Sequence, residues 1–143
     1  MSRILVPLGF LTLLAAGCGS DPTVGTIELA VVGGLTGNGD GTALHIEPDG
    51  TAMRSVNGAA WQTATLDPAT LRSLQAKINA ADFPSLEPMY AGDVTDDFAD
   101  QVTVELDGHD HTVLVEESAD PPARLAAVIE ALRTIHGSAI DWH

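Results

Sequence analysis

Residues 101–116 read QVTVELDGHDHTVLVE. Asp107-Gly108 stands between two segments of alternating and β-branched residues, Gln101–Leu106 and His111–Glu116. An Asp-Gly pair between such segments is a strong hairpin signal, because both central residues of the tight turn need positive φ. We therefore predict an antiparallel hairpin here, around which the other elements are arranged.

Upstream of the hairpin, four more segments have strand-like patterns of apolar and β-branched residues. They are Thr26–Val32, Thr42–Glu47, Thr51–Val56 and Trp61–Leu66. The first two are separated by residues 33–41, which contain five glycines in nine positions. Pro48-Asp49-Gly50 has turn chemistry and joins the second segment to the third.

Two segments are predicted to be helical. Asp67-Pro68 supplies an N-cap and a proline at the first helical position, and Asp120-Pro121-Pro122 precedes the second helix. Gly137 stands where a C-cap glycine is expected. The two apolar stripes have helical spacing, and they consist of Leu71, Leu74, Ile78 and Ala81, then Leu125, Val128, Ile129, Leu132 and Ile135.

The order ββββ-α-ββ-α predicts an α+β domain. We expect an antiparallel sheet of about five to six strands with two helices packed on one face. Residues 85–100, which hold five acids and no base, are expected to be irregular. The helix residues predicted to face the sheet are Leu74, Ile78, Leu125, Val128 and Leu132.

The N-terminal residues have the pattern of a secretory signal. Arg3 precedes an apolar run, Ile4–Ala16, that is too short to span a bilayer. Leu14-Ala-Ala-Gly-Cys18 then resembles the lipobox of bacterial lipoproteins, which implies that Cys18 is acylated after removal of residues 1–17. Residues 18–25 would form a lipidated tether and residues 26–143 the folded domain. The alternative is a secreted protein with a free thiol.

This resemblance implies that the lipid bilayer is a partner, reached through the acylated Cys18, and that the protein resides in the cell envelope. Because Gly19 rather than Asp follows the cysteine, the outer membrane is expected in a bacterium with two membranes. The chain has 6 basic and 20 acidic residues and a net charge of −14, which argues against nucleic-acid binding. A single cysteine excludes an intramolecular disulfide and a multi-cysteine zinc site.

Candidate chemical groups are few, and each has a simpler interpretation. His109 and His111, two apart, would share one face of a strand as a zinc pair, or simply form a solvated hairpin end. His45 is expected on the solvent face. Calcium could bind at the loop Asn38–Gly41, or at a group of acids in residues 93–100. The acids are Asp93, Asp96, Asp97 and Asp100. Alternatively, both are ordinary surface loops. We find no catalytic motif, and therefore predict a binding or inhibitory module without enzymatic activity, cofactor or metal.

Residues 27–37, IELAVVGGLTG, resemble the opening strand and Gly-Gly-Phe-x-Gly turn of the emfourin family. These proteins are small bacterial inhibitors of protealysin-like, thermolysin-type zinc metallopeptidases. Leu35 replaces the usual Phe, and Asp100 stands where Tyr is common. Further similar positions are Leu66-Asp67-Pro68 with Leu71, Ala80-Ala81-Asp82-Phe83, the alternating Asp96, Phe98, Asp100, Val102 and Val104, His111-Thr112-Val113, and Pro121-Pro122 with Leu125.

The resemblance implies an inhibitor that occludes the cleft of a thermolysin-like metallopeptidase. Glycine lets a backbone approach a partner closely, because no Cβ intervenes. We therefore expect contact from the loop 33–41, and secondarily from residues 89–97. Alternatively, the glycines form only a turn, and the protein is a non-inhibitory envelope lipoprotein that serves as a protein-binding or assembly module. The predicted protease-binding residues are Gly33, Gly34, Leu35, Thr36 and Gly37.

Overall fold

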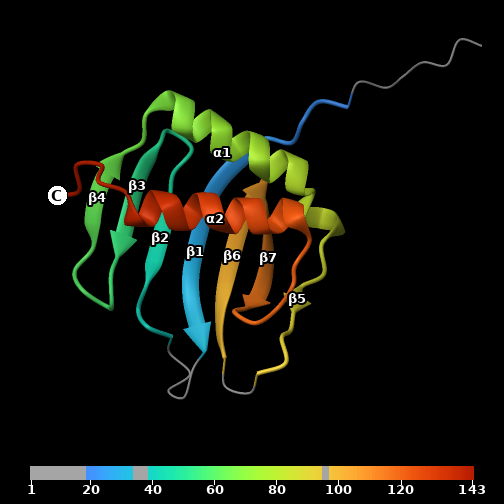
Figure 1. Cartoon of the computed structure of the whole chain (residues 1–143). Helices are drawn as coiled ribbons and strands as arrows, with labels where there is room; N and C mark the ends of the chain where they lie inside the picture. The colour runs from blue at the N-terminus through green and yellow to red at the C-terminus, as the bar shows by residue number, and fades with distance from the viewer. Residues whose placement is uncertain (1–18, 34–38, 95–96) are drawn as a thin grey trace, which may run out of the picture.

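The computed structural model describes residues 19–33, 39–94 and 97–143. Within them the chain forms two layers, a seven-stranded sheet and two helices that lie across one face of it (Figure 1). The strand order is β4-β3-β2-β1-β6-β7-β5. The strands are β1 Val24–Gly33, β2 Ala43–Ile46, β3 Thr51–Ser55, β4 Gln62–Thr65, β5 Met89–Tyr90, β6 Phe98–Leu106 and β7 His109–Glu116.

The predicted α+β class, with both helices on one face, is confirmed. The sheet has seven strands, one more than the six that we predicted at most. That strand, β5, lies in the segment expected to be irregular, and it pairs parallel with β7 whereas the other pairs are antiparallel. A strand of two residues carries no periodicity, so the sequence pattern gave no signal for it.

The central hairpin forms as predicted, but its strands are longer. Asp107 and Gly108 have φ values of 50° and 79°, the positive values that a two-residue turn requires. Because only these two residues turn, β7 begins at His109, two positions earlier than expected. β6 likewise begins three positions early, at Phe98, where it pairs with Gly33 at the end of β1.

Helix α1 spans Pro68–Ala81 and helix α2 spans Ala123–Gly137. The side chain of Asp67 accepts hydrogen bonds from the backbone N–H groups of Ala69 and Thr70, as expected for an N-cap. The predicted C-cap at Gly137 is wrong. The backbone N–H and hydroxyl of Ser138 both donate to the Ile135 carbonyl, so α2 ends without a left-handed glycine.

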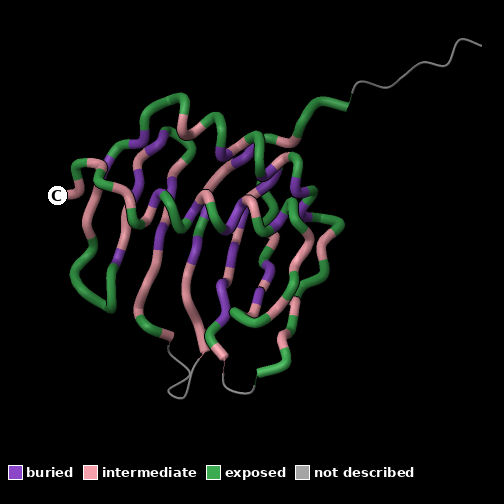
Figure 2. Tube along the Cα trace, in the orientation of Figure 1, coloured by how far each residue is buried: buried purple, intermediate pink, exposed green. Residues whose placement is uncertain are grey.

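The core lies between the helices and the strand residues that face them. In the register of the sheet, Leu29 is opposite Leu44 on one side and Val102 on the other, and all three are at most 1% exposed. Figure 2 shows the buried positions along the middle strands and the inner sides of the helices. The five helix residues predicted to face the sheet are all buried, whereas Leu71, the first residue of the α1 stripe, is only partly buried.

The C-terminal residues cover part of the β4 edge. Thr63 and His143 exchange two backbone hydrogen bonds, of 2.9 and 3.1 Å. The guanidinium of Arg54 lies 4.3 Å from the ring centre of Trp142 and also donates to the His136 carbonyl. The tail therefore occupies backbone groups that would otherwise be open on an edge strand.

Candidate functional site at the loop end

Several connections meet at one end of the sheet, where β1 ends and β6 begins (Figure 1). We call this region the loop end. It comprises Gly33 and residues 39–42, 56–61, 91–94 and 97–98. Gly33, in the first of the two segments singled out in the sequence, pairs with Phe98, the residue that directly follows the second segment, 89–97.

Gly33 is in a conformation that favours glycine. Its φ is +89°, and a Cβ at this position would lie 2.9 Å from the Asp97 carbonyl oxygen. Its own carbonyl accepts a hydrogen bond from the backbone N–H of Gly39. Of the predicted protease-binding residues, Gly33 is thus placed at the loop end, whereas Gly34, Leu35, Thr36 and Gly37 lie outside the described residues.

The β1–β2 connection packs against the turn between β3 and β4. The backbone N–H of Gly58 donates to the Gly41 carbonyl, and a Cβ on Gly41 would lie 2.4 Å from the Gly58 nitrogen. The carboxylate of Asp40, part of the calcium-like motif, accepts the backbone N–H of Thr42 and so supports a local turn. These contacts hold the described part of the loop on the sheet.

Exposed large apolar side chains occur at separate places near the loop end, with Trp61 on the face of the sheet away from the helices and Phe98 on the helix side. Large apolar side chains are normally buried, and a group of exposed ones marks an interaction surface. Trp61 is 57% exposed and Phe98 40% exposed. The sequence pattern placed both in or next to strands and gave no sign of their exposure. Trp61 lies on the face that the helices leave uncovered, whereas Phe98 lies in a hollow with Arg133 and His136 of α2. Among the described residues, the exposed large apolar side chains are Val56, Trp61, Met89, Val94 and Phe98.

Asp100, a candidate calcium ligand, makes an ion pair instead. Its side chain is 6% exposed, and its Oδ2 lies 2.7 Å from Nη2 of Arg133 on α2. Its Oδ1 has no hydrogen-bond partner within the described residues. The pair ties α2 to β6 directly beneath the loop end, beside a hollow of about 370 Å³.

The other candidate calcium ligands do not converge with Asp100. The Asp97 carboxylate accepts the backbone N–H groups of Ser118 and Phe98, and the hydrogen bonds from Ser118 lower the pKa of Asp97. Asp93 lies in the exposed β5–β6 connection, and Asp96 is outside the described residues. Across residues 19–33, 39–94 and 97–143, no three acidic, histidine or cysteine side chains form a metal-binding group.

The predicted histidines lie away from the loop end. His109 and His111 share one face of β7, as their spacing indicated, and line a hollow with Asn79 and Asp82. His45 is on the opposite face of the sheet from Leu44 and Ile46. Its Nδ1 is 2.9 Å from a Glu28 oxygen and its Nε2 is 2.9 Å from a Glu47 oxygen.

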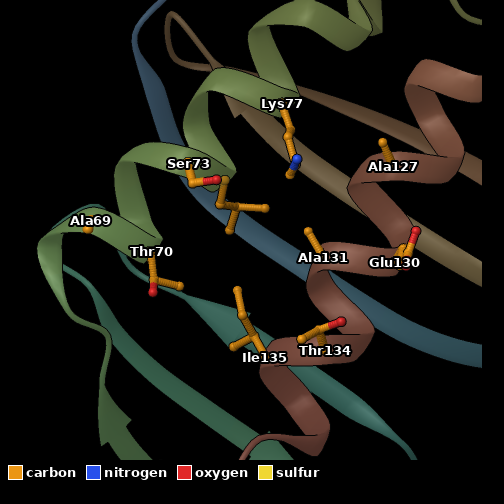
Figure 3. Close-up of a pocket in the computed structure, with 10 residues that line it drawn as sticks. Ala69, Thr70, Ser73, Lys77, Ala127, Glu130, Ala131, Thr134 and Ile135 are labelled. Atoms are coloured by element: carbon orange, nitrogen blue, oxygen red, sulfur yellow. The ribbon is translucent and has the colours of Figure 1, made fainter.

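The outer side of the helix layer carries a separate groove of about 560 Å³ between α1 and α2 (Figure 3). Short side chains leave this space, with Ala69, Thr70 and Ser73 on α1 facing Ala131 and Thr134 on α2. Its charged groups, one from each helix, are Lys77 and Glu130. Neither helix in the described part of the chain is long and apolar enough to cross a membrane.

The N-terminal segment joins the domain at the end of the sheet opposite the loop end (Figure 1). Thr23 donates its backbone N–H to the Asp107 side chain, and its carbonyl accepts the Asp107 backbone N–H, both at 2.9 Å. We call Thr23, Asp107 and Gly108 the tether end. Cys18 and the predicted signal peptide lie outside the described residues.

No family model, curated protein or solved structure matches the chain.

Proposed function

We propose that this protein is a lipid-anchored envelope protein that inhibits a thermolysin-like metallopeptidase by occluding its cleft with the loop end. The observation that carries the proposal is that Gly33, in the segment 33–41, pairs with the exposed Phe98, which directly follows the segment 89–97, at the end of the sheet remote from the tether. The choice of a metallopeptidase comes from the emfourin resemblance.

The arrangement suits an inhibitor that acts by steric blockade. Binding loops work best when a rigid scaffold holds them, and here the long pairing of β1 with β6 ends at the loops. Exposed aromatic side chains such as Phe98 are typical binding anchors.

Charge would assist the encounter. The chain has a net charge of −14, so its long-range field speeds association with a basic cleft and added salt slows that association. The loop end would then hold the complex through apolar contact, which salt weakens far less.

A second candidate is a non-inhibitory envelope lipoprotein that binds another protein or supports assembly. The same exposed apolar side chains favour it, because they suit any protein partner with a complementary apolar surface. Copurification from membranes distinguishes the two, since only the first proposal requires a metallopeptidase among the captured proteins.

The decisive experiment measures inhibition of a panel of thermolysin-like enzymes by the soluble domain from about Asp21 onward. Truncating an anchor residue at an interface typically costs tenfold or more in affinity, so Phe98→Ala should weaken inhibition by about 10- to 100-fold. Arg72→Ala on the exposed side of α1 is the control and should leave inhibition unchanged. Circular dichroism must show that both variants are folded. If the wild-type domain leaves every enzyme fully active, the inhibitor proposal fails.

A further inference from the structure

The face of the sheet opposite the helices, here called the open face, carries a shallow groove of about 410 Å³ beside Trp61. It spans β1, β2 and β3 and reaches the start of β4. The side chains that form it on the open face belong to Glu28, Ala30, Ala43, His45, Met53 and Trp61.

The register of the strands explains the groove. Ala30 is directly opposite Ala43, so two short side chains form its floor. In the adjacent row, Glu28 is opposite His45, and His45 is opposite Met53. These longer side chains form one wall, and Trp61, 57% exposed, stands at the β4 side.

Two carboxylates lie beside this apolar floor, Glu28 in its lining and Glu47 beyond it, and both hydrogen-bond to the His45 imidazole. Glu28 and Glu47 flank His45, and their side chains are 54% and 43% exposed. A long cationic side chain matches such a surface, because its methylene stem covers apolar area while its charge stays near carboxylates. A guanidinium also stacks on an indole ring, as Arg54 does with Trp142 elsewhere in this molecule.

We propose that the groove binds an arginine side chain presented by a partner protein. The stem would lie on Ala30 and Ala43, and the guanidinium would sit between the Trp61 ring and the Glu28 carboxylate. An anionic group would be repelled by Glu28 and Glu47, and a neutral apolar group would gain nothing from them. This inference does not depend on the partner being a metallopeptidase.

The two tryptophans provide a direct test in the full chain held in detergent micelles. The Trp142 indole N–H donates to the Ser138 carbonyl and serves as an internal reference, whereas the Trp61 indole reports on the groove. Trp142→Phe assigns the two signals in a ¹H–¹⁵N spectrum. Butylguanidinium, the arginine side chain alone, should shift the Trp61 signal saturably and leave the Trp142 signal in place.

Neutral and mutational controls decide whether charge recognition is involved. Butylurea, which has nearly the same shape without the charge, should shift the Trp61 signal much less. Glu28→Gln should weaken butylguanidinium binding about two- to fivefold, the range of an exposed ion pair. Glu87→Gln makes the same change in net charge at an exposed site outside the groove and should have no effect.

Three results would overturn the proposal. The first is the absence of a saturable shift of the Trp61 signal. The second is an equal shift with butylurea, which would make the groove a purely apolar site. The third is equal weakening by Glu28→Gln and Glu87→Gln, which would show attraction to the acidic protein as a whole.

Discussion

His45 is held between two carboxylates on the open face of the sheet. Burial by itself would lower its pKa, but the hydrogen bonds and charges of Glu47 and Glu28 outweigh that effect and raise the pKa above 6.5. A raised pKa means that the folded state binds the imidazole proton more tightly than the unfolded state does. The resulting stabilisation is complete below pH 6.5 and is lost as the pH rises through the folded-state pKa.

We therefore expect His45→Gln to cost more stability at about pH 6 than at about pH 8.5. Urea denaturation of both proteins at the two pH values measures the difference. In a Glu28→Gln, Glu47→Gln background, the pH dependence of the His45→Gln effect should shrink, because the groups that raise the pKa are gone. A cost that stays the same at both pH values would contradict this account.

At the scale of the elements, the helices pack on the sheet through a few fully buried side chains. Leu74 on α1 is 1% exposed and Leu132 on α2 is 0% exposed. Truncating a buried leucine to alanine removes apolar contact and leaves a cavity, at a cost of about 2–5 kcal/mol. We expect this cost in the free energy of unfolding for Leu74→Ala and for Leu132→Ala.

The matched control lies on the other side of α1. Arg72 is exposed, and Arg72→Ala should change the free energy of unfolding by less than about 0.5 kcal/mol. Chemical denaturation monitored by circular dichroism measures all three variants. Equal effects of the buried and exposed substitutions would mean that the two faces of α1 contribute alike to the core, contrary to the burial pattern.

The elements that could be predicted from sequence are those with local signals. The Asp107-Gly108 turn, the Asp67 cap and the two helical stripes each depend on residues close together in the chain. β5 could not be predicted, because its two residues form a strand only where β7 lies beside them. The predicted C-cap at Gly137 is wrong because Gly137 is the last residue of α2. The C-cap is Ser138, whose hydroxyl donates to the Ile135 carbonyl.

The candidate site was predictable only in part, for a related reason. Glycine content drew attention to residues 33–41, and the acids and aromatics to residues 85–100. Their meeting at one end depends on the pairing of Gly33 with Phe98, which joins positions 65 residues apart. The exposure of Trp61 depends on which face of the sheet the helices cover.

At the scale of the whole molecule, the predicted lipid anchor rests on Cys18. Cys18→Ser removes the thiol that would carry the diacylglyceryl group. We expect the variant to lack covalent lipid and to retain residues 1–17, because processing at a lipobox follows lipidation. Mass spectrometry of the N-terminus measures both. An unmodified Cys18 in the wild-type protein, or cleavage at another position, would contradict the prediction.

The predicted anchor and the fold together predict an orientation. Residues 19–23 span at most about 17 Å when extended, so acylation of Cys18 would hold the tether end close to the lipid surface. β1 then runs for ten residues, about 30 Å, to the loop end. The acidic domain is also repelled by anionic lipid, which disfavours its lying flat on the membrane. We therefore expect the loop end to point away from the membrane.

Single engineered thiols test this orientation in liposomes that carry the lipidated protein, whose own cysteine is blocked by acylation. Ala59→Cys places an exposed thiol at the loop end, and His109→Cys places one beside the tether end. A polyethylene glycol maleimide is bulky and is excluded from the space next to the bilayer. It should therefore label the thiol at position 59 several times faster than the thiol at position 109. Detergent removes the bilayer and should bring the two rates together, whereas equal rates in intact liposomes would mean that the tether lets the domain turn its loop end toward the lipid.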